Sequence, residues 1–310
     1  MKQEVKIYGA GLAGLLAGCV FQNAQIIEAA PRHNISHKAL LRFRSSAVGD
    51  AVGIPFRKVK VNKGIFISGQ FAQPNILLAN LYSKKVIGKL ADRSIWNLEP
   101  VERFIAPEDF IEQLIERCDH RIQWETKVDA QDIQETPSNH KIISTMPMSV
   151  MTKIIDELDP SMKIDTPAFN FSNITVRRWR IKDADVFQTI YFPHPDTTLY
   201  RASMTKDMLI AEYIGEADPQ VLYLFSAFGI DPFEAEEIGS VKQGFGKIAP
   251  IDDQWRKDFI YNLSNRYDIF SLGRFGTWRN ILMDDVLNDL QVIKKLMNAT
   301  TYERSRINSK

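Results

Sequence analysis

The 310-residue chain has almost no net charge and no long apolar run. Its 39 basic and 38 acidic residues give a net charge of +1, so bulk charge provides no reason to expect a nucleic-acid or membrane partner. No run of about 18 apolar residues is present, which argues against a membrane-spanning helix. Glycines interrupt the apolar stretch Ile7–Phe21, which also lacks the basic start and the cleavage-like end of a signal peptide. We therefore expect a soluble, cytoplasmic protein.

Cysteine is also scarce. Cys19 and Cys118 are far apart in the sequence, and Cys19 falls among small apolar residues, so we expect two buried free thiols and a reducing compartment. No Cys-x-x-Cys pair is present, which argues against disulfide reduction. The 5 histidines show no metal-ligand spacing, so we predict no metal site.

Length and composition indicate two domains of ordinary globular type. A chain of 310 residues exceeds the usual size of one core, and 45% hydrophobic with 25% charged residues is close to average usage. This length leaves room for a cofactor domain and a substrate domain.

Apolar periodicity predicts most of the helices and strands. At the N-terminus a strand over Glu4–Tyr8, a helix over Leu12–Phe21 and a strand over Ala24–Glu28 follow one another. The alternating, aromatic segment Phe169–Ile214 predicts an antiparallel sheet. We also predict a helix starting at Pro107, helices over 147–158, 218–228, 252–262 and 283–297, and strands over 121–128, 141–144 and 267–273.

Two stretches have weaker patterns. Residues 38–95 are mixed and polar, with extended fragments such as Gly64–Ser68. The polar tail Thr300–Lys310 is expected to be frayed.

The most informative motif is Gly9-Ala-Gly11-Leu-Ala13-Gly14, between the first strand and the first helix. In such a motif Gly9 permits the tight turn, Gly11 lets the backbone approach a pyrophosphate, and Gly14 allows the helix to pack closely on the strand. The helix N-terminus then favours the anion. Glu28, at the end of the next strand, can accept the ribose hydroxyls and disfavours the extra phosphate of NADP. The motif predicts a Rossmann-like dinucleotide site, which is common to FAD and NAD.

The C-terminus distinguishes between these cofactors. Residues 271–278 (SLGRFGTW) precede the helix predicted to begin at Met283, and this arrangement resembles the closing motif of glutathione-reductase-type flavoproteins related to amine oxidases, protoporphyrinogen oxidase and UDP-galactopyranose mutase. The resemblance implies FAD, with Gly273 and Arg274 near the flavin and ribityl chain. It also implies that backbone N–H groups near Met283 and Asp284 face the pyrimidine edge, where a helix N-terminus stabilises negative charge.

Other segments match this group in order. The resemblance places Val128 where the adenine is clamped, and residues 141–147 (KIISTMP) resemble the strand that ends beside the dinucleotide. The sequence departs from the pattern after Glu28, where the family has a glycine-rich segment ending in arginine. Here Arg42 or Arg44 is expected to contact the phosphate or the flavin, and the alternative is a solvated basic turn.

The predicted fold class is therefore α/β. We expect a Rossmann-like FAD-binding domain over 1–48, 97–150 and 266–310. A second, α+β substrate domain, built on an antiparallel sheet, is expected over 49–96 and 151–265.

No second strand–GxGxxG–helix unit occurs, so a resident NAD(P)H domain is not expected. The leading hypothesis is oxidation of an amine or amino-acid-like small molecule by hydride transfer to the flavin. Resemblance to the mutase group makes Arg201 the main candidate for holding a carboxylate or phosphate, and the alternative is a surface cross-strand ion pair. Tyr191 is expected to line the pocket. For His194 the alternatives are a place in the lining of the same pocket and a structural role. Trp278 either covers the flavin or belongs to the core.

Two further classes of function remain open. The first is redox-neutral flavin chemistry, by a sugar-nucleotide mutase or by a C–N lyase acting on an amino-acid-modified thymine base in phage-type DNA hypermodification. The basic segments 57–63 and 177–182 suit a nucleic-acid path, although we favour solvated strand edges. The second is a non-catalytic FAD-binding protein. Oligomeric state cannot be predicted from these patterns.

Overall fold

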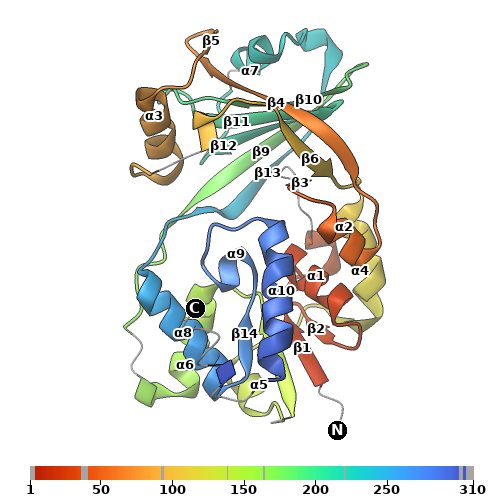
Figure 1. Cartoon of the computed structure of the whole chain (residues 1–310), viewed down its shortest axis with the longest axis vertical. Coiled ribbons are helices and arrows are strands. Elements are labelled where there is room, and N and C mark those ends of the chain that lie inside the picture. Colours follow the sequence, from red (N-terminus) through yellow and green to blue (C-terminus); the bar gives the residue numbers. More distant parts are fainter. Residues whose placement is uncertain are drawn as a thin grey trace.

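The computed structural model describes residues 4–35, 41–91, 94–137, 139–162, 165–219, 221–299 and 303–304. Two sheets divide the molecule into two lobes, with the larger sheet at the top of Figure 1 and the smaller one below it. The smaller sheet has 5 parallel strands and the larger one has 9 strands of mixed direction. The predicted mixed α/β architecture is confirmed.

The smaller sheet is built around β1 (Glu4–Tyr8), in the order β14-β8-β1-β2-β7. Its other strands are β2 (Gln25–Ile27), β7 (Ile122–Gln123), β8 (His140–Ser144) and β14 (Ile269–Ser271). The chain fills one side of β1 first and the other side afterwards. The carboxyl end of β1 is therefore a topological switch point, the place where open α/β sheets bind ligands.

Helices cover both faces of this sheet because successive strand residues point to opposite sides. Ile7 packs in one core with α1 (Leu12–Val20), α2 (Ala47–Val52), α4 (Phe110–Cys118) and α10 (Met283–Met297). Tyr8 packs in another core with α5 (Ala130–Gln134), α6 (Met148–Leu158) and α8 (Asp253–Arg266). The short α9 (Gly273–Gly276) follows β14.

The larger sheet has the order β13-β9-β12-β11-β10-β4-β6-β3. Its strands are β3 (Arg42–Phe43), β4 (Arg57–Ile67), β5 (Gln70–Ala72, paired with β4), β6 (Val101–Ile105), β9 (Phe171–Ile181), β10 (Val186–Tyr191), β11 (Leu199–Lys206), β12 (Met208–Ile214) and β13 (Ala235–Ile248). The antiparallel pairing predicted over 169–214 is confirmed for β10–β11, β11–β12 and β12–β9. The pair β10–β4, which joins that segment to an earlier strand, is parallel.

Two helices pack on this sheet. Residues of α7 (Val221–Phe228) and of α3 (Ile76–Ile87) belong to two separate apolar cores, because alternate strand residues face opposite sides. Short 3₁₀ turns lie at Arg32–Asn34, Ser94–Trp96, Asp119–Arg121, Pro160–Met162 and Pro232–Glu234. No helix in the described ranges is long and apolar enough to cross a membrane.

Some elements differ from expectation. The strand predicted over 121–128 is only two residues long, because the chain turns at Glu125 with φ of 54°. Near the expected domain boundaries, β6 pairs with β4 in the larger sheet, whereas α6 and α8 pack on the smaller one. Most of the tail expected to be frayed lies outside the described residues. Arg304 in that tail is packed, because it is 5% exposed and donates to the carbonyl of Ser264 at 2.6 Å.

Candidate functional site

The carboxyl ends of all five parallel strands meet at one edge. Four backbone hydrogen bonds of 2.8 to 2.9 Å join them, from Gly9 N to Ile27 O, from Thr145 N to Tyr8 O, from Leu272 N to Ser144 O and from Glu28 N to Gln123 O. The N-terminal glycine motif and the C-terminal segment after β14 therefore start from the same edge of the sheet.

The glycines of the motif have different reasons to be glycine. Gly9 has φ of +99°, and a Cβ there would lie 2.4 Å from Oγ1 of Thr145. A Cβ on Gly14 would lie 1.8 Å from the carbonyl oxygen of Gly9. A Cβ on Gly11 would meet nothing within 4 Å. Packing of this chain therefore explains Gly9 and Gly14, whereas Gly11 faces open space.

That open space lies at the start of α1, which is uncapped. No side chain accepts a hydrogen bond at the N-cap residue Gly11, and the first turn has no acidic residue. Three helices are capped by side chains, with Asn75 on α3, Asp129 on α5 and Asp252 on α8, whereas α2, α4 and α6 lack such a cap as α1 does. The first N–H groups of a helix have no intrahelical partner, so an uncapped start is suited to bind an anion.

Glu28 lies beside the glycine turn. Its Oε2 accepts from Ala10 N at 2.5 Å, and its Oε1 accepts from Ala30 N at 2.7 Å. A carboxylate can accept more than one hydrogen bond at each oxygen, so Glu28 keeps capacity for a hydroxyl donor. The segment before Val128 runs next to it, because Thr126 N donates to Glu28 O at 2.9 Å. Val128 is half-buried against the core of α5 and α6.

The C-terminal segment contacts the start of α1. Gly273 has φ of +79°, and a Cβ there would lie 2.8 Å from Cβ of Ala13. Arg274 is half-buried on α9. Trp278 is 2% exposed and its Nε1 donates to Ala249 O at 2.9 Å, so it belongs to the core. The two motifs, one from each end of the sequence, are thus in direct contact.

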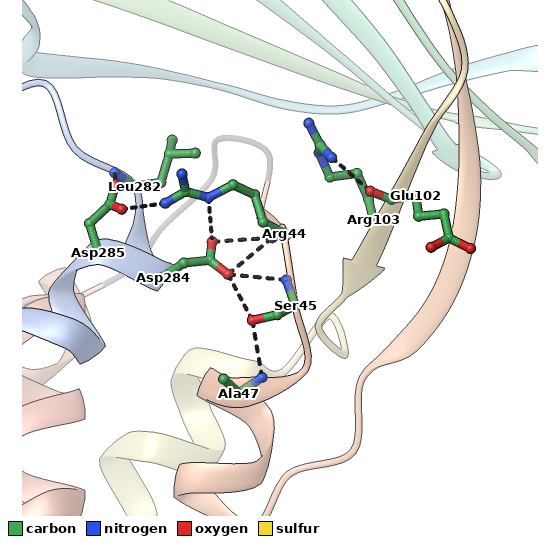
Figure 2. Close-up of polar contacts among 8 residues, drawn as sticks. All are labelled: Arg44, Ser45, Ala47, Glu102, Arg103, Leu282, Asp284 and Asp285. Carbon is green, nitrogen blue, oxygen red and sulfur yellow. Dashed lines mark hydrogen bonds and ion pairs between the residues drawn. The ribbon is translucent and has the colours of Figure 1, made fainter.

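The first turn of α10 is joined to the loop after β3 (Figure 2). The Asp284 carboxylate accepts from Arg44 N at 3.0 Å and from Ser45 N at 3.1 Å, and the Arg44 guanidinium pairs with both Asp284 and Asp285. Partial burial alone would raise the pKa of Asp285. The N–H of Leu282 and the nearby Arg44 lower that pKa below its ordinary value instead. Met283 packs against the core of α1 and α10.

Arg42 points away from this cluster and into the larger sheet. Its guanidinium donates to Thr189 Oγ1 and Thr205 Oγ1, both at 2.7 Å, and to the carbonyl of Met204 at 2.5 Å. Burial, followed by the charge of nearby Arg201, lowers the pKa of Arg42 to about 9. The guanidinium thus joins β3 to β10 and β11, whereas Arg44 is the arginine that lies at α10.

A row of three side chains crosses the larger sheet. Tyr191, Arg201 and Glu212 are neighbours in register on β10, β11 and β12. Arg201 pairs through Nε with Glu212, whose side chain is 4% exposed. Residues two apart on a strand share a face, so this row lies on the face where Thr189 contacts Arg42. Burial tends to raise the pKa of Glu212, but Arg201 holds it below the ordinary value.

Arg201 therefore has the cross-strand ion pair that was its alternative, although the carboxylate is buried. Beside the pair, the hydroxyl of Tyr200 is fully buried with no hydrogen-bond partner. Burial and the carboxylate of Glu212 raise the pKa of Tyr200 well above its ordinary value. Tyr191 packs edge-to-face on Tyr82 of α3, with ring centroids 5.5 Å apart.

Other candidate groups are engaged in the larger lobe. The carbonyls of Phe192, His194 and Leu199 all accept from Nζ of Lys85, so the loop after β10 is fixed to α3. In the basic segment 177–182, Arg177 pairs with Glu237, and Arg180 pairs with Glu108 and Asp207. Within the described part of the chain no group of three or more His, Cys, Asp or Glu residues could hold a metal.

No known family model matches this chain, and no curated protein is similar to it in sequence. Among solved structures, it is similar to reduced UDP-galactopyranose mutase, with a TM-score of 0.67 and 14% identity over 99% of each chain. It is also similar to a CLA-producing fatty acid isomerase from P. acnes, with a TM-score of 0.59 and 11% identity over 95% of this chain and 98% of the other.

A third similar structure is aklavinone-11 hydroxylase in a complex with FAD and aklavinone. Its TM-score is 0.52, with 10% identity over 96% of this chain and 62% of the hydroxylase. At these identities the likeness is one of fold. The fold of this chain therefore occurs in enzymes, one of which is seen with FAD bound.

Proposed function

We propose that this chain is an FAD-dependent enzyme that oxidises an amine or an amino-acid-like small molecule. The observation that carries the FAD proposal is the contact between the open, uncapped start of α1 and the segment after β14. The two motifs that predicted the cofactor come from opposite ends of the sequence and meet at the switch point of the smaller sheet. We further propose that the lobe with this sheet is the FAD-binding domain and that the larger sheet belongs to the substrate domain.

Each part of FAD has candidate partners at this edge. We assign the pyrophosphate to the N–H groups at Gly11–Ala13, because they start an uncapped helix beside open space. Glu28 is assigned to the adenosine ribose, and the backbone at Val128 to the adenine. The flavin and ribityl chain are assigned to Gly273, Arg274 and the start of α10, where Met283 and Asp284 lie.

Arg44 is the basic group assigned to the cofactor, because it lies at α10 while Arg42 is engaged by the larger sheet. Its two carboxylate partners, Asp284 and Asp285, would otherwise place negative charge at the helix start. Arg44 offsets part of that charge, which reduces the repulsion of an anionic group.

When bound, FAD would supply the hydride acceptor for the carbon beside the substrate nitrogen. The chain has to bind and orient the substrate. The face with Tyr191 and Arg201 is the proposed binding surface. The ion pair to Glu212 involves Nε of Arg201, and the terminal nitrogens carry the other N–H donors that can hold a carboxylate. Glu212 fixes the orientation of that guanidinium.

Anaerobic mixing of the FAD-loaded protein with candidate amines tests the reaction. Bleaching of the flavin absorbance with formation of an imine or carbonyl product would support amine oxidation. Product formation without net bleaching would indicate a redox-neutral reaction. If the FAD-loaded protein shows neither bleaching nor product formation, the non-catalytic FAD-binding function would remain.

A redox-neutral flavoenzyme is the second candidate. The observation that favours it is the fold likeness to UDP-galactopyranose mutase over 99% of both chains. This class includes a sugar-nucleotide mutase and a C–N lyase that acts on an amino-acid-modified thymine base in DNA. The DNA version is less favoured, because Arg177 and Arg180 are paired with carboxylates. DNA affinity that does not fall between low and high salt would count against it.

A further inference from the structure

The two cysteines of the chain lie against each other. Cys19 is near the end of α1 and Cys118 is the last residue of α4, and their Sγ atoms are 3.8 Å apart although 99 positions separate them in the sequence. Both are free thiols; Cys118 is buried and Cys19 is half-buried. Gly18 permits this approach, because a Cβ there would lie 3.0 Å from Cys118 Sγ.

A fixed positive charge adjoins the pair. Nη2 of Arg121 donates to Cys118 Sγ at 3.5 Å and to Gly18 O at 3.1 Å, and Nη1 donates to Ala24 O at 3.0 Å. The carbonyls of Gly18, Phe21 and Ala24, in and just after α1, thus hold this guanidinium at the sulfur. The hydrogen bond from Cys19, followed by Arg121, lowers the pKa of Cys118 below its ordinary value despite burial, and the same hydrogen bond raises the pKa of Cys19. A thiolate in contact with a second thiol is the arrangement that oxidises to a disulfide.

We propose that Cys19 and Cys118 are an oxidative modification site, at which a reversible disulfide joins α1 to α4. With hydrogen peroxide as the oxidant, one thiolate sulfur attacks a peroxide oxygen, the O–O bond breaks and hydroxide leaves. The other sulfur attacks the resulting sulfenic acid, the S–S bond forms and water leaves. The two sulfurs lose two electrons and two protons, and one peroxide becomes two waters. A dithiol reductant reverses the reaction by two exchange steps.

The geometry requires only a local adjustment. The sulfurs must close from 3.8 Å to about 2.05 Å. Because the bond would close a loop of 99 positions, it would strongly restrict the unfolded chain. The disulfide would therefore stabilise the lobe that carries the glycine motif. This proposal does not depend on FAD or on the reaction at the other end of α1.

The test uses the full-length protein, with and without added FAD. Native protein is treated with hydrogen peroxide and quenched, then unfolded and alkylated, and a second portion is heated to measure Tm. We expect no alkylated cysteine, a mass lower by two hydrogen atoms, and a cross-linked peptide joining α1 to α4. Tm should rise by roughly 3 to 7 °C and return after treatment with dithiothreitol.

Cys19→Ser is the matched control, because its position is half-buried and the change keeps the hydrogen-bonding group. This variant should show no rise in Tm after peroxide. Cys118→Ala is a second control, chosen because a serine hydroxyl would be buried at that position, and it should likewise show no rise in Tm after peroxide. Two alkylatable thiols after peroxide, sulfinic acid instead of the cross-link, or a cross-link without a rise in Tm would each overturn the proposal.

Discussion

Replacing Gly11 with alanine is expected to weaken FAD binding with little effect on folding, so the two properties can be tested separately. Gly11 has φ of −63° and ψ of 175°, which alanine adopts without strain, and its Cβ would meet nothing within 4 Å of this chain. The added methyl group would occupy the open space in front of the first N–H groups of α1. A pyrophosphate bound there would lose its close approach to the backbone.

The expected effects on the free energy of unfolding and on FAD affinity differ in size. Alanine restricts the unfolded chain, which raises the free energy of unfolding by about 0.4 to 1 kcal/mol. Alanine is also a poorer N-cap residue than glycine, which lowers the free energy of unfolding by a similar amount. The free energy of unfolding should therefore change by less than about 1 kcal/mol. Loss of one hydrogen bond to a charged phosphate costs about 1.5 to 3 kcal/mol, so Kd for FAD should rise roughly 10- to 100-fold.

Urea unfolding and calorimetric titration with FAD measure the two effects. Gly244→Ala is the matched control, because its position is exposed and its Cβ would have only Asn173 Oδ1, at 4.0 Å, as a neighbour. That variant should match the wild type in FAD affinity, and its free energy of unfolding should lie within about 1 kcal/mol of the wild-type value. Gly14→Ala should instead lose about 3 kcal/mol or more, because its Cβ would overlap the carbonyl of Gly9 at 1.8 Å. A Gly11→Ala protein that folds and binds FAD as tightly as the wild type would refute the assignment of the pyrophosphate to α1.

Three further changes probe the rest of the site. Arg44→Ala should lower FAD affinity about tenfold while unfolding free energy falls by less than about 1 kcal/mol, because the Arg44 side chain is 47% exposed; equal affinity in calorimetry would contradict this. Arg201→Gln should cost about 3 kcal/mol at pH 7, because it leaves the Glu212 carboxylate buried and unpaired. In the wild type the pKa of Glu212 is lowered, so its contribution is present above about pH 4.3 and is lost as pH falls through the folded-state pKa. In the variant Lys247 and Tyr200 still lower that pKa, but burial is the largest influence and raises it. The deficit should therefore shrink from pH 7 to pH 5, and a deficit independent of pH would count against the pairing. Lys85→Met should cost about 2 to 3 kcal/mol in urea unfolding and expose the loop after β10 to proteolysis, because three backbone carbonyls, two of them on buried residues, lose their donor.

The sequence was sufficient to predict elements whose apolar pattern matches their burial. The helix expected over 283–297 has the bounds found for α10, and its buried residues recur at helical spacing. The helix α3 was missed for the opposite reason. Its exposed face includes Ile76 at 67% and Leu77 at 62%, while Lys85 turns inward to three carbonyls. A pattern of apolar and charged residues cannot reveal a helix whose polarity is partly reversed.

The sequence was not sufficient to predict the strand β13 or the residue pairs that depend on strand register. β13 lies at an edge of the larger sheet, where β9 is its one partner among the described strands, and most of its positions are exposed or half-buried. Backbone pairing holds it there, and such pairing leaves little sign in the side chains. The partner of Arg201 depends on the register of β11 with β12, which shifts between Leu199 and Arg201. The contact of Cys19 with Cys118 depends on how α1 packs on α4.

The glycine motif and Glu28 were found from sequence because a local turn and helix start set their geometry. The proposed roles of Arg44, Met283 and Asp284 needed the resemblance, and the structure adds that Arg44 and backbone N–H groups pair with the acids on α10. Contacts between distant segments explain why the proposed substrate face was the least predictable part of the site.

Calorimetric titration of the wild-type chain with FAD, after removal of any bound flavin, tests the central proposal most directly. We predict that one FAD binds per chain, with Kd below about 1 μM, and that the bound flavin shows an altered visible spectrum. Excess NAD should not displace it. A folded chain that gives no heat and no spectral change with FAD, or that binds NAD in its place, would contradict the account.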